Sequence, residues 1–431
     1  MPSDRAPRVL HVSQPVTAGV AVAVTGYTRM LAERGWDVVV ASPLGGDLPY
    51  TAREAGGRWT RWDATRSPGR SAVAEARALS AVVRRERPDL VHLHSSKAGL
   101  AGRLLRLDVP TVFTPHAWSW HGAEGVVSRA ARSWERLAVG RTDALLLCGD
   151  DEAVEGVDAG VEATRSEVLG NVIDPRDLPP SDRAAARDAL GVAHRDPVVV
   201  CAARLSHQKG QDVLFEAWAR AGRPGVLVLV GALKGAPALV DQLPPGTTVV
   251  IPASRRDVLL WCAAADVVVA PSRYEGMSLG VLEAAAMGAP VVATDVGGMR
   301  QALAGTPATF VRPEDPAALA AALTGAVEAR AELAETAARA AVVLRARLAH
   351  DWSAGAQRLD ALYRDLTGLP AAVEAHLPVA PATTDQLPAH VPGSHRGAPL
   401  AAPREHDRAR PPAVRHHSPA VVGNIPVGGS R

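Results

Sequence analysis

Two glutamates lie within one stretch of the chain, 271–298, whose sequence is PSRYEGMSLGVLEAAAMGAPVVATDVGG. Glu275 belongs to a predicted turn, and Glu283 belongs to the predicted helix that follows it. Because eight helical residues rise by roughly 12 Å, the two carboxylates are too far apart to share one proton or one metal ion. They suit the two ends of an elongated ligand. For either glutamate alone, an ordinary turn or surface-helix residue is the alternative interpretation.

Backbone amides between the two glutamates form a predicted anion site. Gly276, Met277 and Ser278 lie where the predicted helix begins. The first amides of a helix have no acceptor within it, and they carry the positive end of the helix dipole. Phosphate oxygens bind well at such a position.

Two cations flank a second predicted helix start. The predicted strand 198–202 ends just before Arg204, and a polar loop then leads to Lys209 and Gly210 at the start of an amphipathic helix. Positive charges beside unpaired helix amides favour a diphosphate. The sequence therefore predicts phosphate binding by Arg204 and Lys209.

Alternating strands and helices would place these groups at the carboxyl edges of parallel sheets. The predicted strands are 8–13, 36–41, 89–94, 110–114, 143–148 and 166–170, then 198–202, 225–230, 247–251, 266–270 and 290–293. This alternation predicts an α/β protein with two Rossmann-like parallel-sheet domains that face each other across a cleft. The fingerprint G-x-G-x-x-G does not follow the first strand, so NAD is not an expected cofactor.

The glutamate stretch resembles a known signature. The pattern E-G-x-x-L-x-x-x-E, here Glu275, Gly276, Leu279 and Glu283, is similar to the two-glutamate motif of retaining family 4 glycosyltransferases with the GT-B fold. The residues PS before it and APVVATDVGG after it match the same pattern.

Two further segments share this resemblance. The segment ARLSHQKG, 203–210, is similar to the family's G-R-L-x-x-x-K-G, with Ala203 in place of the first glycine. The segment HSSKAGLAGRL, 94–104, resembles members of the exopolysaccharide type, which points to polysaccharide biosynthesis.

The resemblance implies a UDP- or GDP-linked sugar as the donor and no separate cofactor. In the family, the second glutamate holds the ribose hydroxyls, and the first glutamate with the amides after it holds the sugar and diphosphate. A glycine in the first strand-to-helix loop lies close to the diphosphate, and a histidine after the strand 110–114 reaches the sugar. The implied donor-binding residues are Gly19, Arg204, Lys209, Glu275, Gly276, Met277, Ser278, Leu279 and Glu283, and the implied catalytic residues are His116, Arg204, Lys209 and Glu275. A plain turn glycine and a structural histidine are the alternatives for Gly19 and His116.

The implied reaction is hexosyl transfer with retention at the anomeric carbon. Arg204, Lys209 and the helix amides would stabilise the charge that grows on the departing diphosphate. No D-x-D motif occurs in the sequence, so we expect no metal ion to be required. The resemblance implies a front-face mechanism, in which the leaving phosphate helps to deprotonate the acceptor.

Two departures from the family pattern leave alternatives open: Gln301 replaces a glutamate, and Gly149 replaces a serine. The hinge beginning at Asn171 lacks its glycine and matches the family pattern only in part. A nucleotide-sugar epimerase of the same fold, or a catalytically silent nucleotide-sugar-binding protein, is the alternative function.

Candidate acceptor residues follow two strands of the first domain. His94 and Lys97 lie in a predicted loop, 94–99, where an ammonium and helix amides would favour an anionic acceptor. Trp118 and Trp120 lie in the polar loop FTPHAWSWHG, so exposed indoles that stack on sugar or touch lipid are expected. A solvated lysine and indoles packed beneath the loop are the alternatives.

Four regions are expected along the chain. Residues 1–175 would form the acceptor domain and 176–350 the donor domain, with separate helices predicted over 315–330 and 332–349. A closing helix over 351–369 would return to the first domain. The last 62 residues, 370–431, hold 11 of the 34 prolines and no aromatic residue, which predicts a disordered tail.

Composition excludes some partners and suggests a compartment. A net charge of +2 gives no case for nucleic acid as a partner. Cys148, Cys201 and Cys262 have no metal-ligand spacing and are expected to be small core residues in a reducing compartment. The absence of an apolar signal region or a long apolar run predicts a cytoplasmic protein, with peripheral contact at the inner membrane face left open.

Overall fold

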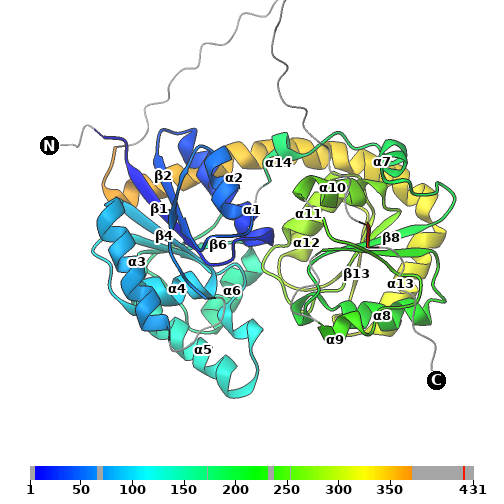
Figure 1. Cartoon of the computed structure of the whole chain (residues 1–431), viewed down its shortest axis with the longest axis horizontal. Coiled ribbons are helices and arrows are strands. Elements are labelled where there is room, and N and C mark those ends of the chain that lie inside the picture. Colours follow the sequence, from blue (N-terminus) through cyan, green and yellow to red (C-terminus); the bar gives the residue numbers. More distant parts are fainter. Residues whose placement is uncertain are drawn as a thin grey trace, which may run out of the picture. The chain divides into compact units, whose positions relative to one another are not determined.

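The computed structural model describes residues 5–65, 71–171, 173–231, 237–252, 254–370 and 421–422. Its first half contains a parallel sheet with the strand order β3-β2-β1-β4-β5-β6-β7 (Figure 1). The strands are rich in β-branched residues and leucine, as strands covered on both faces require. They are β1 (Arg8–Ser13), β2 (Asp37–Ser42), β3 (Arg58–Arg61), β4 (Leu90–His94), β5 (Thr111–Thr114), β6 (Ala144–Leu147) and β7 (Ser166–Val168).

Helices cover both faces of this sheet. Along β1, Val9 and His11 lie on the side of Tyr27 from α1, whereas Leu10 and Val12 pack in the cluster that contains Leu79 from α3. The helices are α1 (Ala18–Ala32), α2 (Leu48–Glu54), α3 (Ala72–Glu86), α4 (Ser95–Leu104), α5 (Gly125–Ala138) and α6 (Asp150–Asp158). A short 3-10 turn, η3 (Pro175–Asp177), and α7 (Arg183–Leu190) then lead to the second half.

The second sheet repeats the first topology. Its order is β13-β12-β11-β8-β9-β10-β14, and the run from β10 to β13 has the same order as the run from β3 to β6. The elements are β8 (Val198–Ala202), α8 (Gln211–Arg220), β9 (Val226–Val230), α9 (Pro237–Val240), β10 (Thr248–Val250), α10 (Arg255–Ala264), β11 (Val267–Ala270), α11 (Leu279–Ala286), β12 (Val291–Thr294), α12 (Met299–Ala302), β13 (Ala308–Val311) and α13 (Pro316–Glu328). The prediction of two Rossmann-like parallel sheets is confirmed. The loops after β1 and β8 lie where the strand order reverses, the usual place for ligands in such sheets.

One long helix joins the two halves. The helix α14 (Arg330–Thr367) is continuous over 38 residues, so the separate helices predicted over 332–349 and 351–369 are one element. The N-terminal part of α14 packs on the domain of the second sheet, where Arg345 donates to the carbonyl of Ala286 in α11 at 2.8 Å. The C-terminal part of α14 packs on the domain of the first sheet, where Asp360 accepts from the Trp36 indole at 2.7 Å. No proline interrupts this alanine-rich run, and the return to the first domain occurs within it.

Two other local expectations are wrong. The predicted loop 94–99 does not exist, because α4 begins at Ser95, directly after β4. The tail is not structureless at Val421–Val422, which form β14 and pair antiparallel with β10. Most of the predicted tail, 371–420 and 423–431, lies outside the described residues.

The three cysteines are buried and unpaired, as predicted for core residues. Among the described residues, no helix is both long enough and apolar enough to cross a membrane.

Candidate functional site

Lys209 and Glu275 meet at the carboxyl edge of the second sheet. Lys209 ends the short turn after β8, and Glu275 lies in the loop between β11 and α11. The Lys209 ammonium lies 2.5 Å from Oε1 of Glu275, which also accepts a hydrogen bond from the Ser272 hydroxyl at 2.7 Å. The Glu275 side chain is only 7% exposed and that of Lys209 is 20% exposed, so the ion pair is largely shielded from water.

Close backbone contacts fix this loop. Gly210, directly after Lys209, has φ +63°, and a Cβ built there would lie 2.0 Å from the Pro271 carbonyl. Gly297 has φ +49°, and a Cβ built there would lie 2.1 Å from the Glu275 carbonyl oxygen. Both positions therefore require glycine for backbone conformation and for space. The two glycines let the β8, β11 and β12 loops approach closely enough to place Glu275 beside Lys209.

A small cavity opens beside this ion pair. It is lined by the ends of β8 and β11 and by the first turn of α11, with Ala203, Lys209, Ser272, Glu275, Ser278 and Gly280 among its lining residues. Ser278 is the N-cap of α11 and makes no side-chain cap hydrogen bond. The amides of the first helical turn have no acceptor within the helix. An ammonium and helix amides thus converge on one cavity, the combination expected for a phosphate site.

Glu283 occupies the far end of the same helix-loop unit. It is 6% exposed, and its Oε1 lies 2.6 Å from a terminal nitrogen of Arg255, at the start of α10. Burial raises the pKa of the Glu283 carboxyl, while the charge of Arg255 and its hydrogen bond act in the opposite direction. The interpretation of Glu283 as a solvated helix residue is therefore wrong.

Arg204 and Gly19 are two further residues that the resemblance assigns to donor binding. Arg204 follows β8 and lies near enough to Tyr274 for its charge to lower the pKa of that phenol, against the larger opposing effect of burial. Gly19 is exposed in the first turn of α1, directly after Ala18, and a Cβ built there meets nothing within 4 Å. The structure thus leaves open space beside Gly19.

His116 lies in a strained loop of the first half. His116 and Ala117 both have positive φ, +53° and +77°, which is uncommon for residues with a side chain. The carboxylate of Glu152, in the first turn of α6, holds this loop by accepting from the amide of Ala117 at 2.7 Å and from that of Cys148 at 2.7 Å. Glu152 belongs to the segment GDDE, 149–152, and is not among the site residues predicted from the sequence.

Loops of the two halves meet at this point. A Cβ built at Gly276 would lie 3.2 Å from the amide nitrogen of Ala117. The side-chain amide of Asn171 donates to the Met277 carbonyl at 2.6 Å, and the rings of His121 and Tyr274 stack with centroids 5.3 Å apart. The structure therefore brings His116 and the Glu275 loop to the same place, although they are far apart in the sequence.

Two departures from the resembled pattern face each other. The Oε1 atom of Gln301 lies 3.4 Å from the amide of Asp150, as a long hydrogen bond, and 3.2 Å from a Cβ built at Gly149. Gln301 thus fills space that a side chain at 149 would claim. The two departures therefore lie in contact with each other.

A chain of histidines lies behind His116. Nε2 of His116 is 3.1 Å from Nδ1 of His94, and Nε2 of His94 is 2.8 Å from Nδ1 of His11. The other ring nitrogen of His116 lies 3.4 Å from the sulfur of Cys148. Burial lowers the pKa of His116 to about 3, so its imidazole is neutral at physiological pH. Both nitrogens of His116 are engaged inside the protein in this structure.

The predicted acceptor residues are less accessible than expected. Trp118 and Trp120 are each 2% exposed and stack on each other with centroids 4.8 Å apart, so the prediction of exposed indoles is wrong. Their ring nitrogens donate to the Glu152 carbonyl and the Glu155 carboxylate, which satisfies them inside the fold. His94 is completely buried and presents no surface to a ligand.

Lys97 is also a structural residue in this geometry. Its ammonium lies 2.6 Å from a carboxylate oxygen of Glu75 on α3, and the residue is 5% exposed. The alternative of a solvated lysine is wrong, and the lysine does not face an open site. The sequence missed Glu75 because the two partners lie on different helices and share no motif.

Comparison with known proteins agrees with this geometry. The family described as "Glycosyl transferase 4-like domain" matches residues 18–172, and the family described as "Glycosyl transferases group 1" matches residues 196–329. A D-inositol 3-phosphate glycosyltransferase from Geodermatophilus obscurus is 34% identical over 361 residues, which are 74% of this chain and 80% of that protein. One from Xylanimonas cellulosilytica is 33% identical over 346 residues, 70% of this chain and 83% of that protein.

The chain belongs to the group 1 glycosyltransferases. Its resemblance to the family 4 type is confirmed. Because these relatives are named as transferases, glycosyl transfer is supported, whereas the epimerase and the silent binding protein are not.

Solved structures show that this glycosyltransferase has the GT-B fold. Sucrose-phosphate synthase from Thermosynechococcus elongatus aligns with a TM-score of 0.72 at 22% identity and covers 84% of this chain and 99% of its own. HepE from Anabaena, solved in complex with UDP-glucose, aligns with a TM-score of 0.69 at 22% identity and covers 83% of this chain and 99% of its own. The predicted fold class is confirmed.

Proposed function

We propose that this glycosyltransferase moves a hexosyl group from a UDP- or GDP-linked sugar to an acceptor, with retention at the anomeric carbon and without a metal ion. The observation that carries the proposal is the Lys209–Glu275 ion pair beside the first turn of α11. It offers an ammonium and helix amides to a diphosphate and a carboxylate to the attached sugar. The complex of the structural relative HepE with UDP-glucose favours the uridine nucleotide.

In this proposal Lys209, Arg204 and the α11 amides stabilise the negative charge that develops on the departing diphosphate. These fixed positive groups take the part that a metal ion plays elsewhere. The acceptor oxygen bonds to the anomeric carbon as the bond to the diphosphate breaks, and the acceptor proton passes to a phosphate oxygen. His116 lies at the junction of the two loops and is assigned to the sugar, which its imidazole would reach by giving up its contact with His94 or with Cys148.

The proposed acceptor is a phosphorylated polyol. Two of the relatives are named for D-inositol 3-phosphate, which favours a phosphorylated polyol among the glycan, lipid-linked and small-molecule acceptors.

Incubation with UDP-glucose or GDP-mannose, with and without an inositol phosphate, tests the proposal. We expect release of the free nucleotide that depends on the acceptor and persists in the presence of a metal chelator. The coupling constant of the anomeric proton in the product reports retention. Activity that disappears with the chelator, or a product with inverted stereochemistry, would contradict the corresponding part of the proposal.

Glu283→Gln is expected to weaken the binding of the matching nucleoside diphosphate by roughly ten- to a hundredfold. The amide keeps the size of the side chain but replaces lone pairs with donors, so one hydrogen bond to the ribose hydroxyls is lost, worth about 1.5–3 kcal/mol. Titration calorimetry with UDP and GDP measures the change. A 2′,3′-dideoxynucleotide is the control, because it lacks the partner hydroxyls and should lose little further affinity. Equal losses for both nucleotides would assign Glu283 to another role.

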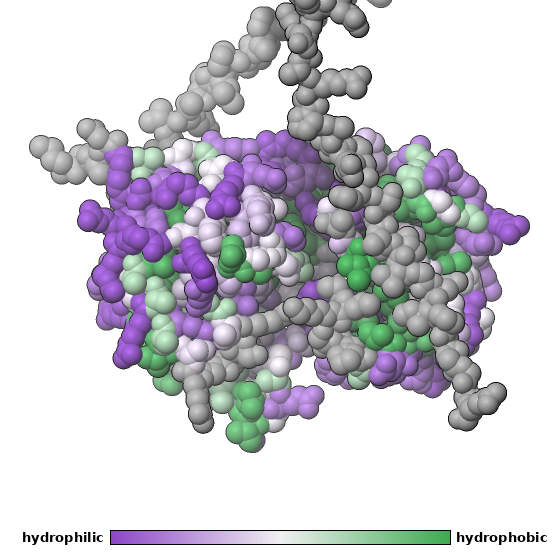
Figure 2. Space-filling model, viewed as in Figure 1, coloured by the Kyte–Doolittle hydropathy of each residue, from purple (hydrophilic) through white to green (hydrophobic). Residues whose placement is uncertain are grey.

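Peripheral membrane contact is also part of the proposal, and α5 supports it. Val126, Val127 and Leu137 are 71%, 64% and 77% exposed on a helix that also carries Arg129 and Arg132. In Figure 2 hydrophobic and hydrophilic residues lie side by side at the lower end of the first half, where Figure 1 places α5. Exposed apolar residues beside arginines favour the surface of an anionic membrane.

The double substitution Val126→Ser and Val127→Ser is expected to reduce sedimentation with anionic phosphatidylglycerol vesicles by roughly tenfold, because two apolar side chains no longer enter the interface. The matched control is Val342→Ser with Val343→Ser, an adjacent pair of similar exposure, 70% and 71%, on α14. Equal binding by both double variants and the unmodified protein would remove α5 as the contact surface.

A further inference from the structure

A buried carboxylate in the proposed donor site is held by one arginine from a different helix. Both Nε and a terminal nitrogen of Arg255 contact the same oxygen of Glu283, Oε1, at 2.7 and 2.6 Å. Among the described residues, no hydrogen bond reaches the second oxygen, Oε2. An arginine that engages one carboxylate oxygen fixes the orientation of the group and leaves the other oxygen available to accept from a ligand.

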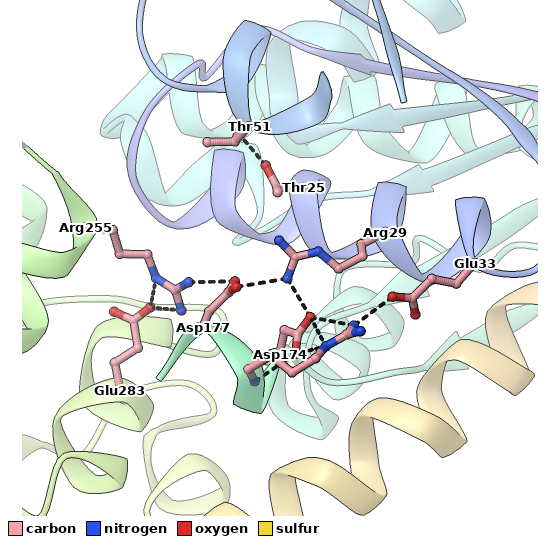
Figure 3. A network of polar contacts seen from close by, with 9 residues as sticks. Thr25, Arg29, Glu33, Thr51, Asp174, Asp177, Arg255 and Glu283 are labelled. Atoms are coloured by element: carbon pink, nitrogen blue, oxygen red, sulfur yellow. Dashed lines mark hydrogen bonds and ion pairs between the residues drawn. The ribbon is translucent and has the colours of Figure 1, made fainter. Parts of the chain in front are cut away.

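Arg255 is held in turn by the linker between the two sheets. Its other terminal nitrogen donates to Asp177 of η3 at 3.1 Å, and Asp177 also accepts from Arg29 of α1 at 2.9 Å. Arg29 further contacts Asp174, at 2.5 Å. Figure 3 shows the chain of contacts from Glu283 through Arg255 and Asp177 to Arg29, which lies on a helix of the first half.

Two members of this chain of contacts, Arg255 and Asp177, are the charged groups that shift the pKa of Glu283. Arg255 on α10 is its cation, and Asp177 in the linker and the thiol of Cys262 on α10 are the other titratable groups that act on it or respond to it. Burial raises the pKa of Glu283, and Asp177 adds to that effect, while Arg255 lowers the pKa. Without Arg255, the carboxyl would have no cation to offset its burial and would bind a proton at a higher pH.

We propose that Arg255 is a positioning residue of the nucleotide site, which keeps Glu283 ionised and oriented so that Oε2 can accept from the ribose hydroxyls of a nucleoside diphosphate. Asp177 holds Arg255 in this place. The inference rests on the proposed function, since it takes Glu283 as the ribose ligand. It makes the linker part of the donor site, although Asp177 would touch no ligand.

Four variants of the full chain test this inference: Arg255→Gln, Arg255→Lys, Asp177→Asn and Arg255→Gln combined with Glu283→Gln. Affinities for UDP and GDP are measured by calorimetry at about pH 8 and about pH 6, a range in which a raised carboxyl pKa is visible. Glu283→Gln alone is measured in the same way. Because it has no carboxyl at this position, it reports the pH dependence of the phosphate and of the rest of the site.

Arg255→Gln is expected to lower nucleotide affinity roughly tenfold at about pH 8. At about pH 6 the loss should be larger, because the ionised carboxylate is the acceptor and the unpaired carboxyl takes up a proton as the pH falls. Arg255→Lys should recover part of the affinity by restoring the charge. Asp177→Asn should lower nucleotide affinity about threefold. The double variant should bind the nucleotide no more weakly than Glu283→Gln, because Arg255 acts only through Glu283.

Arg220→Gln is the matched control, since Arg220 forms an exposed ion pair with Glu216 at 2.6 Å on α8 and should leave affinity unchanged. Melting temperatures confirm that each variant is folded, and Asp177→Asn tests the inference if Arg255→Gln does not fold. Additive losses of affinity in the double variant, or tighter nucleotide binding by Arg255→Gln, would overturn the inference. So would an affinity of Arg255→Gln that depends on pH in the same way as that of Glu283→Gln. Unchanged affinity in Glu283→Gln would refute the proposed ribose role itself, whereas a loss there with none in Arg255→Gln and Asp177→Asn would refute only this inference.

Discussion

Replacing Lys209 by alanine is expected to lower kcat/KM by roughly a hundredfold. The ammonium is held 2.5 Å from Glu275 beside the first turn of α11, where the diphosphate is proposed to leave. A charge-assisted contact is worth about 1.5–3 kcal/mol, and a contact that strengthens as the leaving group gains charge acts mainly on the transition state. Initial rates with whichever of UDP-glucose and GDP-mannose supports transfer measure the effect.

The ion pair itself requires a control. Among the described residues, Lys209→Ala leaves the Glu275 carboxylate with the Ser272 hydroxyl at 2.7 Å as its remaining side-chain partner, so part of the loss could come from a displaced loop. Combining Lys209→Ala with Glu275→Gln removes both charges and should restore the melting temperature more than the rate. Lys209→Arg should rescue poorly, because a planar guanidinium does not replace a compact ammonium. Full activity in Lys209→Ala would exclude the lysine from the reaction.

Gly210→Ala is expected to abolish most of the activity and to destabilise the protein by about 3 kcal/mol or more. An alanine at φ +63° costs about 1–2 kcal/mol in backbone strain. The built Cβ also lies 2.0 Å from the Pro271 carbonyl, so the backbone must move, which adds about 1–3 kcal/mol. The displaced segments carry Lys209 on one side and the Glu275 loop on the other.

Gly191→Ala separates these two effects. Gly191 has nearly the same φ, +65°, but a Cβ built there meets nothing within 4 Å. It should therefore show only the cost of backbone strain, with kcat/KM unchanged. Chemical unfolding gives the free energy of each variant and initial rates give its activity. Equal destabilisation by the two substitutions would mean that the contact with Pro271 relaxes without cost.

Much of the architecture could be predicted from local patterns. The run RVLHVS and the apolar runs around 200 and 268 predict buried strands because parallel strands covered on both faces are continuously apolar. The motif around Lys209 and the two glutamates could be found for a similar reason, since each ligand-binding loop directly follows one strand. Helix lengths were less predictable, because nothing in α14 marks where one domain's packing ends and the other's begins.

The environment of each site residue was not predictable in this way. Trp118 and Trp120 lie in a polar segment, yet both are buried, because Glu152 and Glu155 from α6 supply acceptors for their ring nitrogens. From the sequence, Lys97 is expected to be an exposed cation, but in the structure it is buried in an ion pair with Glu75 of α3. In each case the partner lies on another element, and no spacing in the sequence connects the two.

By itself, the sequence determined the alternation of strands and helices, the positions of the loops that follow β8 and β11, and the residue types within them, because these depend on neighbours along the chain. Only the tertiary structure decided which charges meet. It paired Lys209 with Glu275 and Glu283 with Arg255, and it placed Gln301 against Gly149. The physical reason is that ion pairs and close contacts depend on distances in space, which the packing of whole elements sets.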